Sequence, residues 1–108
     1  MSSDWIPVAL VSEIPEGQML AVNVNGDAVC VYNLQGTFYA TQNVCTHAEA
    51  SLAEGYIDGD CIECPLHQAL FDIRTGKARS APATEDLRVY AVDVQGERIL
   101  VDAASPPA

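Results

Sequence analysis

Two short segments of the sequence combine cysteine with histidine at close spacing. The first runs from Cys45 to His47 and the second from Cys64 to His67, with residues 48–63 between them. Each segment places a thiolate and an imidazole on one loop, so two such loops side by side offer two sulfurs and two nitrogens. That set is enough to complete the coordination of a two-iron, two-sulfide cluster. Anionic thiolates favour the iron that stays ferric, and neutral imidazoles make the other iron easier to reduce.

The same residues could also form a zinc site, a disulfide framework or a metal-free core. Zinc accepts the same ligand types, and Cys61 stands three residues before Cys64, as in half of a zinc knuckle. Using that pair leaves Cys45, His47 and His67 as too many ligands for one tetrahedral ion. A disulfide framework needs an oxidising compartment, which the N-terminal sequence does not indicate. Buried thiols and hydrogen-bonded histidines with no metal would make the spacing a coincidence. We favour the cluster.

The remaining two cysteines have structural interpretations. Cys30 lies in the apolar run 28–32, where a small thiol fills the core of a strand. Cys61 is expected in a strand beneath the second cysteine–histidine loop, and we favour that role over ligation.

The elements that must position these loops are strands. Residues 19–24 and 28–34 are aliphatic runs joined by Asn25-Gly26, a dipeptide typical of a tight hairpin turn. Residues 37–41 follow Gln35-Gly36 as another strand. Residues 88–94 alternate polar and apolar side chains and reverse at Gln95-Gly96 into a strand over 98–101. The pattern predicts one all-β domain, a sandwich or barrel, interrupted by an irregular functional segment from Cys45 to Lys77.

Composition and charge limit the function. The 108 residues are 49% hydrophobic and 19% charged, which is typical of a globular domain. No apolar run is long enough to span a bilayer, and the N-terminus does not resemble a signal peptide, so we expect a cytoplasmic protein with reduced thiols. The net charge is −10, and residues 1–73 contain ten carboxylates but no lysine or arginine. Such a field repels nucleic acid and anionic lipid. The acidic residues could steer a basic protein partner or could only keep the surface solvated, and both interpretations stay open. The candidates for steering are the five carboxylates between the ligand segments: Glu49, Glu54, Asp58, Asp60 and Glu63.

The residues from 43 to 78, NVCTHAEASLAEGYIDGDCIECPLHQALFDIRTGKA, resemble the Rieske ferredoxins that serve bacterial aromatic-ring-hydroxylating dioxygenases. The likeness covers nearly the whole chain. It implies an all-β fold, with a Rieske-type antiparallel β-sandwich base and a small cluster-binding subdomain over about 44–77, in one domain of residues 1–108. It also implies one [2Fe–2S] cluster, with Cys45 and Cys64 on one iron and His47 and His67 on the other. Pro82 would shield one side of the cluster.

The same resemblance separates two classes of Rieske protein. High-potential members tie their ligand loops with two further cysteines, at positions that here hold Ala50 and Leu66. They also direct serine and tyrosine hydroxyls at the cluster, where this chain has Ala69 and Phe71. Because such donors stabilise the reduced cluster, we expect a potential on the order of −150 mV rather than about +300 mV.

The resemblance implies an electron carrier and not an enzyme. The sequence has no dinucleotide-binding fingerprint and no second set of metal ligands for oxidation chemistry. The expected partners are a flavoprotein ferredoxin reductase dependent on NAD(P)H and a terminal Rieske non-haem iron oxygenase, with no nucleic acid and no membrane. We expect a monomer. The alternative is a small Rieske-like subunit of an assimilatory reductase such as nitrite reductase.

Overall fold

Strands make up most of the fold. A computed structural model describes residues 5–45, 50–65, 69–79 and 85–103. Within these ranges there is no α-helix, and two short 3₁₀ turns are present, η1 (Val11–Glu13) and η2 (Leu52–Glu54). The strands are β1 (Trp5–Leu10), β2 (Met19–Val24), β3 (Asp27–Leu34), β4 (Thr37–Gln42), β5 (Tyr56–Asp58), β6 (Cys61–Glu63), β7 (Leu70–Asp72), β8 (Val89–Tyr90), β9 (Val92–Gln95) and β10 (Arg98–Asp102).

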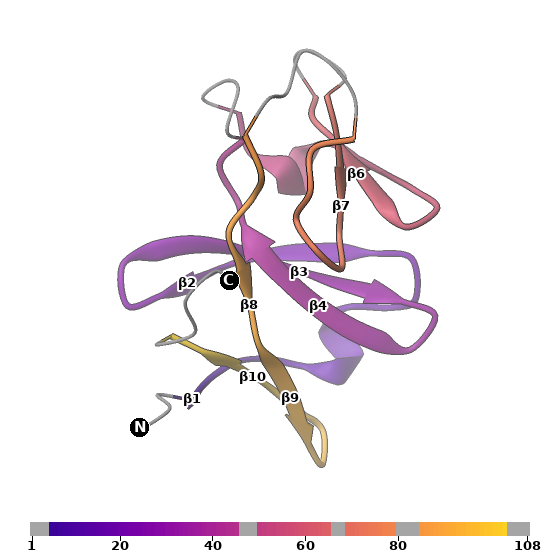
Figure 1. Cartoon of the computed structure of the whole chain (residues 1–108). Coiled ribbons are helices and arrows are strands. Elements are labelled where there is room, and N and C mark those ends of the chain that lie inside the picture. The colour runs from indigo at the N-terminus through magenta and orange to yellow at the C-terminus, as the bar shows by residue number, and fades with distance from the viewer. Residues whose placement is uncertain (1–4, 46–49, 66–68, 80–84, 104–108) are drawn as a thin grey trace.

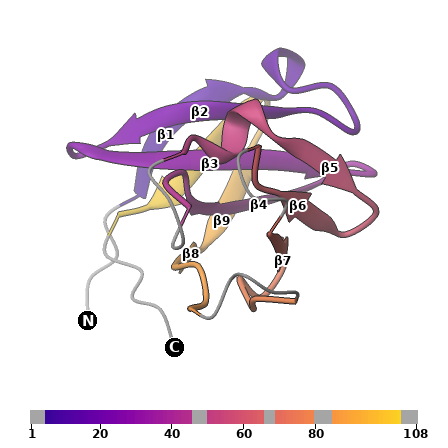
Figure 2. The same ribbon diagram turned by 90° about the horizontal axis from the view of Figure 1, so that it is seen from above.

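The strands form three antiparallel sheets stacked as layers (Figure 1). The middle sheet has the order β2-β3-β4-β8, and β1-β10-β9 lies on one side of it. The third sheet, β5-β6-β7, lies on the other side; seen from that end of the molecule, it covers one part of the middle sheet (Figure 2). This arrangement confirms the predicted all-β fold with an antiparallel sandwich base. No described residue belongs to a helix with the length and apolar character needed to cross a bilayer.

The β2–β3 hairpin forms where Asn25-Gly26 predicts it. Both residues have positive φ, 52° and 91°, as the favoured two-residue hairpin turn requires. The β3–β4 turn repeats this geometry at Gln35 and Gly36, with φ of 55° and 90°. These turns fix the register, so that Cys30 lies opposite Ala21 on β2 and opposite Thr41 on β4.

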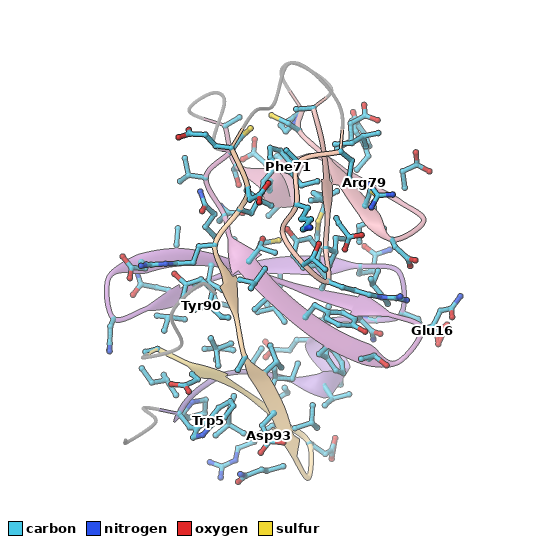
Figure 3. All side chains as sticks on the ribbon, in the orientation of Figure 1. Trp5, Glu16, Phe71, Arg79, Tyr90 and Asp93 are labelled. Carbon is cyan, nitrogen blue, oxygen red and sulfur yellow. The ribbon has the colours of Figure 1, made fainter. Side chains whose placement is uncertain are left out.

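Strand β3 is buried on both faces because it lies between two cores. Val29 and Val31 pack into the core shared with β1-β10-β9, whereas Cys30 and Tyr32 pack into the core shared with the third sheet. This is the period of two that a strand imposes on its side chains. Phe71 and Trp5 lie in the layers on opposite sides of the middle sheet (Figure 3). The β3 sequence is therefore a nearly continuous apolar run and not an alternation.

The prediction of a single strand over residues 88–94 is wrong. The segment divides at Ala91 into β8, which pairs with β4, and β9, which pairs with β10. The chain thus passes from the middle sheet to the lower one, as Figure 1 shows. The alternation continues through the break because Tyr90 and the partly buried Val92 both pack against the core between those sheets. Strand β1 was not predicted; it is an edge strand whose pairing with β10 is irregular between Pro7 and Ala9, a position that tolerates proline.

Candidate metal centre

The two candidate ligand loops close in the same way. The Cys45 N–H donates to the Ala50 carbonyl at 3.0 Å, and the Cys64 N–H donates to the Ala69 carbonyl at 2.8 Å. Each cysteine therefore begins a loop that returns to it five residues later. The predicted ligands His47 and His67 lie within these loops, outside the described residues.

The two thiols face one apolar core. Cys45 is 4% exposed and Cys64 is fully buried, and neither forms a disulfide. Both belong to the core cluster that contains Leu52 and Phe71. Two reduced, water-shielded sulfurs at one end of the molecule suit a soft iron–sulfur centre, because thiolates are its preferred ligands and an apolar shell controls solvent access. The described part of the site therefore fits two ligands of a [2Fe–2S] cluster.

The second loop stands on a regular hairpin. Strands β6 and β7 pair Cys61 with Asp72, Ile62 with Phe71 and Glu63 with Leu70. Ile62 and Phe71 are fully buried, so this cross-strand pair anchors the hairpin in the core. Cys64 follows β6 directly and takes its position from the hairpin.

The first loop continues the middle sheet. Beyond β4 the pairing reduces to one isolated bridge, Val44 to Ser51. The Asn43 N–H donates to Ala28 O on β3 at 3.0 Å, and Asn43 O accepts from Leu52 N–H at 2.7 Å. Cys45 is therefore fixed to the base by the backbone on both sides of its loop.

The structure supports the interpretations of Cys30 and Cys61. Cys30 is fully buried, and this burial raises the pKa of its thiol to about 12, so it remains a neutral core group. Cys61 lies in β6 as predicted and is partly exposed. Partial burial raises the pKa of the Cys61 thiol, and the Asp72 carboxylate adds to this effect. Among the described residues, no three histidine, cysteine, aspartate or glutamate side chains converge on a possible metal position. The described acidic side chains therefore do not complete a zinc site around Cys61 and Cys64.

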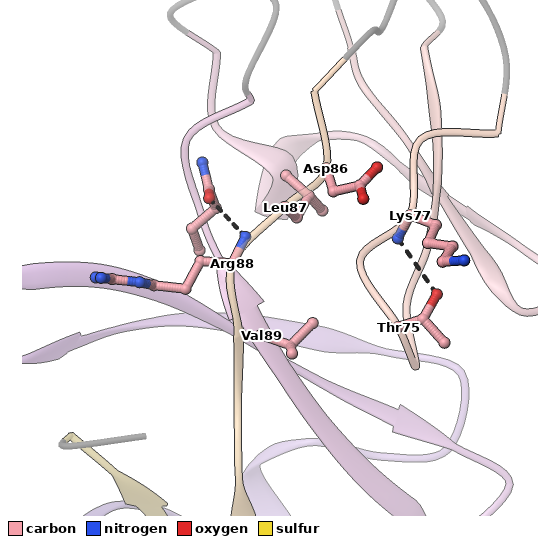
Figure 4. Close-up of a pocket in the computed structure, with 7 residues that line it drawn as sticks. Thr75, Lys77, Asp86, Leu87, Arg88 and Val89 are labelled. Carbon is pink, nitrogen blue, oxygen red and sulfur yellow. Dashed lines mark hydrogen bonds between the residues drawn. The ribbon is translucent and has the colours of Figure 1, made fainter. Parts of the chain in front are cut away.

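The segment that would carry the shielding Pro82 lies outside the described residues, but its two ends are described. The Asp86 carboxylate accepts from Ala78 N–H at 2.9 Å, and Leu87 N–H donates to Gly76 O at 2.7 Å. Beside them is a pocket of about 380 Å³ (Figure 4), lined by Gln42, Thr75, Lys77, Asp86, Leu87, Arg88 and Val89. Neither Cys45 nor Cys64 lines it, so this pocket flanks the candidate centre and is not part of it.

Polar side chains beneath the first loop were missed from the sequence. The Gln42 side chain accepts from Arg88 N–H at 2.7 Å and donates to Val44 O at 2.7 Å. It thus joins the first loop to the segment leading into β8. The signal available was a Gln-Asn pair at the end of a strand, two residues before a candidate ligand.

The acidic residues proposed for steering differ in their surroundings. Asp60 pairs with Arg74 at 3.4 Å between side chains that are 57% and 53% exposed. Glu54 and Asp58 are exposed, Glu63 is half-buried, and Glu49 lies outside the described residues. Steering by these carboxylates remains a hypothesis.

Comparison with known proteins identifies the family. The Rieske [2Fe-2S] domain matches residues 4–91. The chain belongs to this family. The match confirms the predicted resemblance and gives the protein one [2Fe–2S] cluster, which supplies a one-electron redox couple.

Relatives of this Rieske protein narrow its role. It is 43% identical over 102 residues to the ferredoxin component of the naphthalene 1,2-dioxygenase system of Pseudomonas aeruginosa, covering 94% of this chain and 98% of that one. Among solved structures, it matches a chain in the complex of reduced oxygenase and oxidized ferredoxin in carbazole 1,9a-dioxygenase, with a TM-score of 0.88, 39% identity and 94% of each chain covered. This Rieske protein is an electron-transfer component and not itself a catalytic enzyme.

A more distant neighbour shares only the fold. The NADH-dependent nitrite reductase small subunit from Mycobacterium tuberculosis superposes with a TM-score of 0.86 at 20% identity, covering 97% of this chain and 99% of that chain.

Proposed function

We propose that this protein carries single electrons in an aromatic-ring dioxygenase system. It accepts them from a flavoprotein ferredoxin reductase that oxidises NAD(P)H and delivers them to a terminal Rieske non-haem iron oxygenase. The observation that carries the proposal is the pair of buried, unbridged thiols on matching loops, in a chain that aligns over nearly the full length of a dioxygenase ferredoxin component. The protein acts as a soluble, cytoplasmic monomer.

The ligand assignment is part of this proposal. Cys45 and Cys64 bind one iron, and His47 and His67 bind the other. The equivalent loop closures at Ala50 and Ala69 support the assignment, because they place both cysteines at the same point of similar loops. Residues 44–77 then act as the cluster-binding subdomain of a single domain.

A low reduction potential follows from the surroundings of the second loop. Ala69 and Phe71 are both fully buried, and neither side chain can donate a hydrogen bond. Reduction adds negative charge, which donors near the sulfurs would stabilise. Ala50, also buried, excludes the disulfide that ties the loops of high-potential Rieske proteins. We therefore place the potential on the order of −150 mV.

The first experiment establishes the cluster in the purified protein. Two irons and two acid-labile sulfides per chain are expected, with the electron paramagnetic resonance signal of a mixed-ligand centre after reduction. A colourless protein that binds zinc would contradict the proposal.

The second experiment separates the carrier from the alternative role in an assimilatory reductase. Purified reductase and oxygenase of a naphthalene dioxygenase system are mixed with NADH and naphthalene, with and without this protein. Product that depends on adding the protein supports the carrier role. Failure to transfer electrons to the oxygenase, together with stable binding to a nitrite reductase catalytic chain, would favour the alternative. Light scattering on the same sample tests the monomer.

A further inference from the structure

Asn43 lies beneath the first ligand loop and connects its two ends. It is 7% exposed and stands two residues before Cys45. Its side-chain amide donates to Ser51 Oγ at 2.8 Å, and its side-chain carbonyl accepts from Ala53 N–H at 3.0 Å. Its backbone carbonyl accepts from Leu52 N–H at 2.7 Å. One residue therefore holds three consecutive residues on the returning side of the loop.

The chemistry of these partners fixes the orientation of the amide. The Ala53 N–H can only donate, so it must face the oxygen of the Asn43 side chain. The nitrogen then faces Ser51 Oγ, which has lone pairs to accept it. Both halves of the buried amide are satisfied, and a side chain without an acceptor would leave the buried Ala53 N–H unpaired.

The Asn43 side chain joins the two ends of the first loop by hydrogen bonds, where a hairpin would use a second pair of backbone residues. Above it, the Val44–Ser51 bridge and the Cys45–Ala50 hydrogen bond lead directly to the loop. Below it, its N–H donates to Ala28 O on β3. Asn43 therefore connects the base sheet to Cys45, and its side chain fixes the spacing between the two ends of the loop.

We propose that Asn43 is a positioning residue for the iron–sulfur centre, which holds Cys45 in the geometry that the cluster requires. The inference rests on the proposed assignment of Cys45 as a ligand. Asn43 is not itself a ligand of the metal; it acts through the loop.

The chain offers a matched control in Asn33. This residue is 6% exposed, and its side chain also makes one donated and one accepted bond, to Ile14 O at 2.8 Å and from Gly36 N–H at 2.8 Å. It lies beside the β3–β4 turn, opposite Phe38, and both of its side-chain hydrogen bonds are made to residues of the base. Asn33→Ala therefore removes an equivalent pair of hydrogen bonds from the base sheet alone.

The test compares Asn43→Ala with Asn33→Ala in the cluster-loaded protein. Loss of visible absorption in the presence of an iron chelator is expected to be roughly tenfold faster than wild type for Asn43→Ala and little changed for Asn33→Ala. The electron paramagnetic resonance g values should shift only in Asn43→Ala. Amide hydrogen exchange verifies each lesion, because the Ala53 amide loses its acceptor in one variant and the Gly36 amide in the other.

Asn43→Asp provides the conservative variant. Its carboxylate can accept from Ala53 N–H and from the Ser51 hydroxyl, so the wild-type g values should return, whereas the buried charge itself costs stability. The added negative charge opposes reduction, so the potential should fall below that of wild type.

The outcomes separate the two proposals. Equal cluster lifetimes and g values in Asn43→Ala and Asn33→Ala, or g values in Asn43→Asp that shift as they do in Asn43→Ala, would overturn the positioning role. An Asn43→Ala protein that cannot hold a cluster while Asn33→Ala can would support it. Wild-type protein without a [2Fe–2S] cluster would refute the proposed function instead.

Discussion

The two ligand loops close with the same hydrogen bond but stand on different supports. The second loop rests on the β6–β7 hairpin, where three residue pairs join the strands. The first rests on one isolated bridge and on the side chain of Asn43. Backbone pairing is available to almost any sequence, because every residue except proline carries both a backbone N–H donor and a C=O acceptor. A side-chain support depends on one residue type. Substitutions beneath the two loops should therefore act by different means.

The supports also differ in how they reach the base of the molecule. The first loop prolongs β4 and is hydrogen-bonded to β3 through Asn43 and Ala28. The second belongs to a separate sheet, which meets the base through apolar contacts of Ile62 and Phe71. Side-chain hydrogen bonds of Asn43 add to the burial of Leu52 under the first loop, whereas strand pairing and apolar burial support the second.

The largest expected effect is the loss of the cluster, and it should be the same whichever loop loses its cysteine. Cys45→Ala and Cys64→Ala should each abolish the whole cluster, because each removes a thiolate from the same iron. Cys61→Ala is the control, since Cys61 is partly exposed in β6 and is not among the proposed ligands. Iron, acid-labile sulfide and visible absorption measure the result. A cluster that survives in Cys64→Ala but is lost in Cys61→Ala would overturn the ligand assignment.

A pair of substitutions tests the two kinds of support directly. Phe71→Ala empties part of the core under the second loop and should lower the free energy of unfolding by about 3–5 kcal/mol. Ser51→Ala removes the hydrogen bond to Asn43 and leaves its buried amide nitrogen unpaired, which should cost about 1–3 kcal/mol. Urea denaturation at matched cluster content provides the measurement. Equal losses would show that the two supports do not differ in kind.

The sequence predicts the β2–β3 hairpin of the base and one strand of the second support, but not the first support. Asn25-Gly26 identifies a hairpin because the turn needs positive φ at both positions, and the placement of Cys61 in a strand follows from local pattern. The β8–β9 break escapes prediction because both strands pack against one core, which keeps the alternation intact. The Asn43 contacts have no periodicity at all, and their partners are known only once the chain has folded. The histidines follow from motif spacing and remain predictions.

The supports touch at Gly55, and a substitution there should disturb both. Gly55 follows η2, and a Cβ at this position would collide with the carbonyl oxygen of Glu63, the residue before Cys64. The Cβ position is fixed by the Gly55 backbone and the Glu63 oxygen is itself backbone, so neither can move aside cheaply. Gly55→Ala should therefore destabilise the fold by about 1–3 kcal/mol and speed cluster loss. Gly59→Ala, which meets open space, is the steric comparison, although its positive φ adds some strain. Thermal unfolding and chelator challenge measure the two; no effect in Gly55→Ala would mean that the supports separate freely.

A smaller effect is expected on the reduction potential of the cluster, and only for a substitution in the second loop. Ala69→Ser adds a hydroxyl where this buried position has no donor. A new hydrogen bond of about 1 kcal/mol to the reduced centre raises a one-electron potential by roughly 40 mV. Ser51→Ala, under the first loop, should leave the potential near its wild-type value. Protein-film voltammetry measures both, and a lower potential in Ala69→Ser would contradict the proposed cause of the low potential.

The smallest effect concerns the exposed charges of the third sheet. Asp60 is paired with Arg74 in a solvated geometry, and such pairs contribute about 0–1 kcal/mol, so Asp60→Asn should barely change stability. Asp58 has no ion-pair partner among the described residues, so its charge is fully available to a basic partner. If carboxylates steer the encounter, Asp58→Asn should slow the second-order reaction with such a partner by up to roughly twofold, and Asp60→Asn by less.

Stopped-flow measurements across a salt series test this difference. The gap between Asp58→Asn and Asp60→Asn should close as ionic strength rises, because salt screens exposed charges beyond about 10 Å at 0.1 M. Equal rates for wild type and both variants at low salt would remove steering from this face. A gap that persists at high salt would instead indicate a direct contact of Asp58 with the partner. In either case the cluster lifetime should stay at the wild-type value, since neither carboxylate belongs to the Asn43 contacts or to the Ile62–Phe71 pair that support the ligand loops.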